Sequence, residues 1–231
     1  MKILHVNCNY ITTALHQKMI EELDRQGVDN TVFVPTYDKS KSTIQVRNNV
    51  IVSQCFKKFY RYNFDLKQNC IIKSLERNVC VNDYDCIHAY TLFTDGNCAM
   101  KLAQKSGKPF VVAVRNTDVN EFFKKRLLLR KRGVKILRKA SAVFFLSNKY
   151  KEEVFAKYLP SKYRSEIEKK SFVIPNGIDD FWYRNINLPK SIESKDIVKV
   201  GKILFPAPYA LKRAFAKQFF NDRNRLIVRL I

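Results

Sequence analysis

The chain has 231 residues, of which 46% are hydrophobic, and a formal net charge of +22. This length fits one large domain with a buried core, or one domain and part of another. No run approaches the roughly 18 apolar residues of a membrane-spanning helix, and the apolar start is too short for a signal peptide, so we expect a cytoplasmic globular protein.

The six cysteines show neither the paired spacing of metal ligands nor the context of a secreted protein. We therefore expect buried, reduced thiols and assign no metal site.

The chain opens with the pattern strand, helix, strand. Residues 2–7 are an apolar run, residues 11–26 repeat leucine or methionine every four positions, and residues 31–34 are β-branched and aromatic. A turn that binds NAD or FAD needs glycines, and residues 7–12 contain none, so we exclude a dinucleotide cofactor.

Residues 83–118 predict the unit around which the rest of the chain is arranged. A short apolar run, a helix closed by Gly107, and a second apolar run at residues 110–114 are typical of a β-α-β unit. In a parallel sheet, ligands bind outside the carboxyl ends of the strands. The polar residues predicted at that edge are His88, Tyr90, Arg115, Asn116, Thr117 and Asp118.

The remaining apolar runs complete an alternating pattern. We expect further strands at residues 50–52, 142–146 and 172–174, and helices at residues 64–77 and 149–158. The fold class is therefore predicted to be α/β, with a doubly wound, mostly parallel sheet and helices on both faces.

Four short motifs resemble those of a known family. They are Asp85-Cys-Ile-His-Ala-Tyr90, Val114-Arg-Asn-Thr-Asp118, Phe145-Leu-Ser147 and Val173-Ile-Pro-Asn-Gly-Ile-Asp179. In this order they resemble the amino-terminal half of a GT-B glycosyltransferase of family 4, a large retaining family that includes bacterial capsule, lipopolysaccharide and exopolysaccharide transferases. The resemblance covers residues 1 to about 203.

The resemblance implies two Rossmann-like domains, with the acceptor held mainly by the first and a nucleotide sugar by the second. We expect residues 1–183 to form the first domain and residues 184–231 to be a linker and the start of the second. The chain has no glutamate after Ile203, and about 30 residues cannot build a nucleotide-binding domain. We therefore expect a truncated transferase that is inactive alone, with no cofactor; a nucleotide-sugar donor is expected only with a complete second domain.

The resemblance also implies roles for single residues. His88 stands where the family has a strand-end histidine, in a pattern that often reads His-x-His, and Tyr90 replaces the second histidine. Arg115 stands where a histidine commonly contacts the donor sugar; its permanently charged guanidinium suits an anionic acceptor or a leaving phosphate. An alternative of equal weight is an Arg115–Asp118 ion pair, with Asp118 as an N-cap and Glu121 completing a capping box.

Asn176 and Gly177 form a predicted turn, because both residues tolerate positive φ. Their place in the cleft comes from the resemblance alone. We predict a cleft lined by His88, Tyr90, Arg115, Asn116, Thr117, Asp118, Asn176 and Gly177, and firmly assign no catalytic residue.

Residues 124–139 carry nine basic side chains and no acidic one. In helical projection Phe123, Leu127, Val134 and Leu137 share one face. Leu129 and Ile136 lie roughly opposite, among the cations. One interpretation is a solvated cationic face on a helix that packs on the core.

A second interpretation of this segment is docking on the anionic inner face of the cytoplasmic membrane, where transferases of this kind often find lipid-linked acceptors. The residues concerned are Lys124, Lys125, Arg126, Arg130, Lys131, Arg132 and Lys135. Nucleic acid ranks last as a partner, since no nucleic-acid-binding module accompanies the charge.

The function predicted from sequence is sugar transfer from a nucleotide sugar to a lipid-linked glycan acceptor in surface polysaccharide synthesis. The alternative, from another class, is a non-enzymatic cationic module that binds anionic membrane or nucleic acid.

Overall fold

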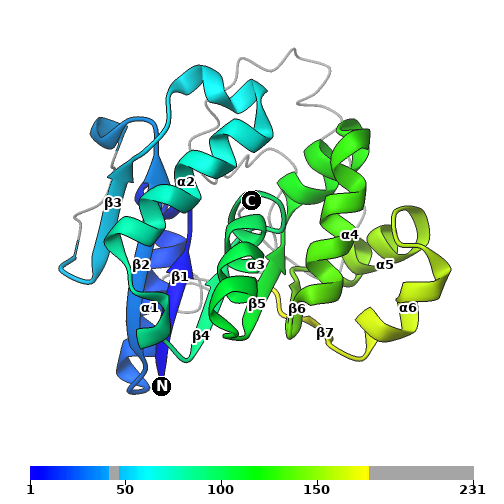
Figure 1. Ribbon diagram of the computed structural model, residues 1–231. Coiled ribbons are helices and arrows are strands. Elements are labelled where there is room, and N and C mark those ends of the chain that lie inside the picture. Colours follow the sequence, from blue (N-terminus) through cyan, green and yellow to red (C-terminus); the bar gives the residue numbers. More distant parts are fainter. Residues whose placement is uncertain (42–46, 177–231) are drawn as a thin grey trace, which may run out of the picture. The chain divides into compact units, whose positions relative to one another are not determined.

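The strands of the chain assemble into one parallel sheet. The computed structural model describes residues 1–41 and 47–176 (Figure 1). Within them, seven strands lie in the order β3-β2-β1-β4-β5-β6-β7. Their bounds are β1 Lys2–Val6, β2 Asp29–Thr36, β3 Val50–Gln54, β4 Cys86–Ala89, β5 Phe110–Val114, β6 Ala142–Phe145 and β7 Ser171–Val173. Each neighbouring pair is parallel, which confirms the predicted doubly wound α/β class.

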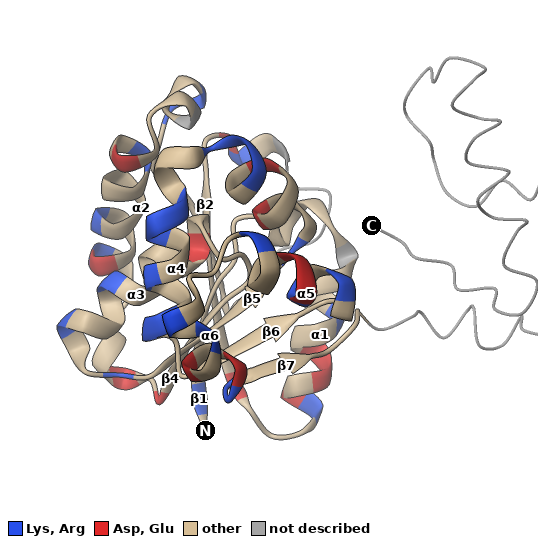
Figure 2. Cartoon of the chain, turned by 90° about the vertical axis from the view of Figure 1, so that its right-hand side faces the viewer, with Lys and Arg blue, Asp and Glu red and all other residues tan. Residues whose placement is uncertain are grey.

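Helices cover both faces of this sheet, with α1 on one side and α2, α3 and α4 on the other (Figure 2). The helices are α1 Ala14–Arg25, α2 Phe64–Asn78, α3 Thr94–Ser106, α4 Arg130–Lys139, α5 Asn148–Lys157 and α6 Ser161–Glu168. Side chains alternate along β1: Leu4 and Val6 join the larger core, under α2 and α3, while His5 faces the side of α1. The sheet is therefore buried by two separate apolar layers.

The direction in which the chain winds changes between β1 and β4. The two strands pair directly, with His5 opposite His88. The helix after β1 covers one face, and the helix after β4 covers the other. This is the topological switch point of a doubly wound sheet, and in such sheets ligands bind outside the carboxyl ends of the strands at this point.

The basic segment is not the single helix that the sequence predicted. A turn of π-helix at Asp118–Phe123 (η5) is followed by a 3-10 turn at Leu127–Leu129 (η6) and only then by α4. Arg126, with φ −105° and ψ 75°, interrupts the helix and resets its phase. The predicted apolar face is correct for Phe123, Val134 and Leu137, which are buried, and wrong for Leu127, which is 62% exposed. Ile136, which was predicted to lie among the cations, is fully buried.

None of the described helices is both long enough and apolar enough to cross a membrane. The predicted domain boundary between residues 183 and 184, and the predicted linker at 184–231, lie outside the described residues.

Candidate functional site

The polar residues predicted at the carboxyl edge of the sheet come from neighbouring strands. His88 lies in β4, Tyr90 follows β4 directly, and Arg115 follows β5. Because β1 and β5 both pair with β4, these residues surround the switch point.

All three histidines of the chain gather at this place. The Nδ1 atoms of His5 and His88 are 3.2 Å apart, and the His88 ring stacks on Tyr90 with centroids 4.5 Å apart. His16, at the start of α1, meets the Tyr90 ring edge-on at 4.8 Å. Of the three, only His88 was predicted to lie here, since nothing in the spacing of residues 5, 16 and 88 shows that they converge.

Burial keeps these imidazoles neutral. It lowers the pKa of His5 to about 4, and burial together with the charge of Arg115 lowers the pKa of His16 to about 3. The pKa of His88 lies well below its ordinary value, through burial first and then the neighbouring His5 and Arg115. At neutral pH the site therefore offers uncharged rings beside one fixed positive charge.

That positive charge is the Arg115 guanidinium. Its Nε donates to the Tyr90 carbonyl at 2.7 Å, and its Nη1 donates to Asn176 Oδ1 at 3.4 Å. Burial lowers the pKa of Arg115, but an arginine in a protein stays protonated. Arg115 therefore links the ends of β4 and β5 to the turn after β7, and its Nη2 bonds to no described residue.

Asp118 is a structural anchor rather than the predicted N-cap. Its buried carboxylate accepts hydrogen bonds from the backbone N–H groups of Leu92 (3.0 Å), Phe93 (3.2 Å) and Arg115 (2.9 Å). The predicted capping box and ion pair are wrong, because Asp118 bonds the Arg115 backbone and lies within 4 Å of no described cationic group. Burial raises the pKa of Asp118 to about 6, although these three bonds oppose the shift.

Of the remaining predicted cleft residues, Asn116 is held by neighbouring side chains, whereas Thr117 is exposed. Asn116 Oδ1 accepts from the Tyr150 hydroxyl at 3.1 Å and from the Asn120 side chain, which ties it to α5 and η5. Gly177 lies outside the described residues, so the lining of a cleft by the whole set stays a prediction.

Asp95 is a buried acid that the sequence analysis missed. Its carboxylate accepts from the backbone N–H of Cys8 at 3.3 Å and from the Thr91 hydroxyl at 3.0 Å. Burial raises its pKa to about 7. Asp95 ties the loop after β1 to the start of α3, and its only local signal is an acid in the first turn of a helix.

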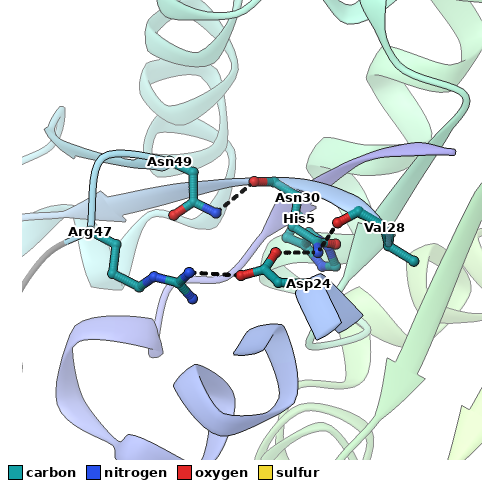
Figure 3. Close-up of polar contacts among 6 residues, drawn as sticks. All are labelled: His5, Asp24, Val28, Asn30, Arg47 and Asn49. Carbon is teal, nitrogen blue, oxygen red and sulfur yellow. Dashed lines mark hydrogen bonds and ion pairs between the residues drawn. The ribbon is translucent and has the colours of Figure 1, made fainter. Parts of the chain in front are cut away.

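Behind the histidines lies a second polar group, which the sequence analysis also missed (Figure 3). Asn30 Nδ2 donates to Asp24 Oδ1 at 2.8 Å and to the Val28 carbonyl at 2.9 Å, while His5 Nε2 lies 2.9 Å from Asn30 Oδ1. Arg47 pairs with Asp24 at 2.8 Å. These residues connect α1 and β2 to the histidine pair.

The seven basic residues predicted to bind membrane fall into two groups. Arg130 donates to the carbonyls of Phe123 and Lys124, Arg132 pairs with Asp65, and Lys125 pairs with Glu121. The other four are exposed and form no ion pair with any described residue: Lys124, Arg126, Lys131 and Lys135.

Comparisons with solved structures identify the same architecture. Sucrose-phosphate synthase from Thermosynechococcus elongatus superposes with a TM-score of 0.61 at 14% identity, covering 82% of this chain and 53% of that one. A UDP-N-acetylglucosamine 2-epimerase superposes with a TM-score of 0.52 at 12% identity, covering 76% and 48%. The chain thus spans about half the length of these proteins, and the likeness shows a shared fold.

A comparison with curated protein sequences finds no match. The model of Glycosyltransferase Family 4, however, matches residues 17–180, which include β2 to β7 and the polar edge of the sheet. The chain therefore belongs to Glycosyltransferase Family 4.

Proposed function

We propose that this chain acts in sugar transfer, holding a lipid-linked glycan acceptor at the edge formed by β1, β4 and β5. The donor, a nucleotide sugar, would be bound by a second domain of the kind that the family resemblance implies. The product would be an extended glycan in the synthesis of a surface polysaccharide.

The observation that carries this proposal is Arg115. The Tyr90 carbonyl and Asn176 hold its guanidinium at the switch point, and Nη2 remains without a described partner. Guanidinium N–H groups match the oxygens of a phosphate, and partial burial strengthens the attraction. A lipid-linked acceptor carries its glycan on a diphosphate, so Arg115 would bind the diphosphate while the half-buried, neutral His88 ring meets the sugar.

The first test measures acceptor binding by the full chain. With only three histidines, all at the site, the imidazole NMR signals report on this edge alone. A polyprenyl-diphosphate saccharide in detergent micelles should shift these signals, and the Arg115→Gln variant should bind it about tenfold more weakly or worse, because a charge-assisted hydrogen bond contributes roughly 1.5–3 kcal/mol. Arg77→Gln, at an exposed position on α2, is the matched control.

Unchanged histidine signals at saturating saccharide would contradict the proposal. Equal weakening by Arg115→Gln and Arg77→Gln would show general attraction by the protein's charge instead of a site.

Residues 124–135 support a second candidate function, peripheral docking on an anionic membrane. Leu128 is 96% exposed and Leu127 62%, and both lie on η6, between the exposed cations Lys124 and Lys131. A projecting apolar tip flanked by Lys and Arg is typical of protein segments that lie in the membrane interface. We propose that Leu127, Leu128 and the cations beside them bring the edge formed by β1, β4 and β5 to the inner face of the cytoplasmic membrane.

A further inference from the structure

A continuous chain of polar contacts leads from the molecular surface to His88. It runs from Arg47 to Asp24 (2.8 Å), to Asn30 (2.8 Å), to His5 (2.9 Å) and to His88 (3.2 Å), and Figure 3 shows the first two of these contacts. His5 and Asn30 are buried, and His88 is half-buried. Each contact constrains where the hydrogens of the next residue lie.

The first constraint fixes the Asn30 amide. One of its two terminal atoms lies 2.8 Å from Asp24 Oδ1 and 2.9 Å from the Val28 carbonyl, both of which can only accept. That atom must be the NH2 group, so the amide cannot be turned around. The Asn30 oxygen therefore faces His5 Nε2 and accepts a hydrogen from it.

The second constraint passes through His5. In a neutral imidazole one nitrogen donates and the other accepts. Since Nε2 of His5 donates to Asn30, its Nδ1 carries the lone pair, and the hydrogen between the two rings must belong to His88 Nδ1. Nε2 of His88 is then the nitrogen without a hydrogen.

The charged groups around the pair favour these neutral forms. Arg115 raises the cost of a proton on His88, and the nearby His16 is itself neutral. Asp24 favours a proton on His5, but burial outweighs it. No described residue bonds to Nε2 of His88, whose ring stacks on Tyr90 at the edge of the sheet.

We propose that Asp24, Asn30 and His5 are positioning residues that hold His88 as its Nδ1–H tautomer, so that Nε2 accepts a hydrogen bond from a hydroxyl group of the bound glycan. The choice of a glycan rests on the proposed function above. Arg115 and His88 then bind different parts of the ligand. The Arg115 guanidinium binds the diphosphate, and Nε2 of His88 accepts a hydrogen bond from a sugar hydroxyl. Hydrogen bonds of this kind discriminate strongly against a sugar that lacks the hydroxyl.

The first measurement needs no ligand. In the full chain labelled with nitrogen-15 at histidine, a two-bond proton–nitrogen correlation spectrum shows which nitrogen of each ring carries hydrogen. At pH 7 we expect His88 with hydrogen on Nδ1 only and His5 with hydrogen on Nε2 only. A wild-type His88 with hydrogen on Nε2 would overturn the proposal.

Two variants and a control test the positioning residues. Asn30→Ala removes the acceptor for His5 and should give His88 signals that average the two tautomers. Asp24→Asn is isosteric and partly exposed, so it should fold, but its amide oxygen and the Val28 carbonyl can still accept from Asn30, so it should change the His88 signals less. Asn49→Ala removes a side chain that donates to the Asn30 backbone carbonyl at 2.8 Å but lies outside the chain of contacts, and it should leave the tautomer unchanged.

A His88 tautomer that stays the same in Asn30→Ala would overturn the proposal. A second measurement adds the polyprenyl-diphosphate saccharide: His88→Phe should lose about 2- to 10-fold in affinity, the effect of one hydrogen bond. If the saccharide fails to bind while the tautomer responds as expected, the proposed function fails and the positioning role stands.

Discussion

Asp118 joins three backbone N–H groups that local structure leaves without partners. Those of Leu92 and Phe93 lie just before α3, where the first turn of a helix has no acceptor of its own. The third belongs to Arg115 itself. The carboxylate therefore fixes the loop after β4 and the loop after β5 in one arrangement, and with it the position of the Arg115 backbone.

Asp118→Asn should destabilise the protein by about 1–3 kcal/mol for each buried donor left without an acceptor. An asparagine keeps the shape but turns an NH2 group toward backbone N–H groups. The free energy of unfolding, measured in urea, gives the result. Asp83→Asn, at an exposed position, should change it by less than about 0.5 kcal/mol, and equal effects of the two would refute this role for Asp118.

The buried histidines and acids predict opposite effects of pH on stability. His16 has a folded pKa of about 3, below its unfolded value near 6.5, so the unfolded state binds more protons in between and stability is lost as pH falls. Asp95 has a folded pKa of about 7, above its unfolded value, so its contribution is lost as pH rises from about 4 to 7. The two contributions partly cancel in the wild type.

His16→Phe separates these contributions, because it keeps an aromatic ring against Tyr90 and removes the titration. Between pH 4 and 6.5 its free energy of unfolding should rise less steeply with pH than that of the wild type, by about 1.4 kcal/mol per pH unit. Urea titrations at three pH values in this range measure the slope. Parallel curves for the two proteins would show that His16 is not held neutral.

At the scale of elements, α4 approaches the core through Gly133. A Cβ atom there would lie 2.7 Å from Phe93 Cζ and 2.9 Å from Phe123 Cζ. Both phenylalanines are fully buried, and Phe123 also stacks on Tyr158, so neither ring has free space to move into. The missing side chain is what lets this helix pack closely against η5 and the start of α3.

Gly133→Ala should therefore destabilise the protein by about 1–2 kcal/mol, even though alanine favours a helix by up to about 1 kcal/mol over glycine. Lys135→Ala, at an exposed position of α4, is the control and should be close to neutral. A Gly133→Ala protein at least as stable as the wild type would mean that the two phenylalanines shift readily.

Elements with a strong apolar pattern were predictable, and those that depend on distant partners were not. The strands were found because their residues are apolar or β-branched, whereas α6 was missed because Ile167 is its one buried residue in eight. The roles of Asp95 and Asp118 depend on partners up to 87 residues away. The contact of His5 with both Asn30 and His88 likewise exists only once β1, β2 and β4 are in register.

At the scale of the whole molecule, the charge of +22 is unevenly distributed. α4 carries basic residues and no acidic one along its length (Figure 2). Each Lys or Arg near an anionic membrane contributes roughly 1 kcal/mol, so we expect the four exposed cations near Leu127 and Leu128 to support reversible binding. The total charge, by contrast, would attract the protein to any anionic surface in any orientation.

A test compares two sets of four substitutions to Gln. The first set removes the exposed cations of the proposed docking surface, Lys124, Arg126, Lys131 and Lys135. The control set removes the same net charge from exposed positions on other elements, Lys73, Lys101, Lys149 and Lys169, and we expect it to weaken binding to anionic liposomes less than the first set does. Sedimentation with liposomes measures binding, which should also fall as salt shortens the Debye length from about 10 Å at 0.1 M to about 3 Å at 1 M. Equal weakening by the two sets, or equal binding to uncharged liposomes, would rule out a specific docking surface.

The strand order has a consequence for the time course of synthesis. β1 lies inside the sheet, between β2 and β4. β2 can pair with it early, but Cys86, the first residue of β4, comes 83 residues after Ile3, the β1 residue with which it pairs. At about 5–20 residues per second, a ribosome needs roughly 4–17 s to add that stretch. Throughout this interval one edge of β1 has no neighbour, so the nascent chain exposes an apolar strand with unsatisfied backbone groups, a state that invites pairing with other chains. A slowly translated message would prolong this exposure, and we therefore expect slow codons between β2 and β4 to lower the yield of native protein.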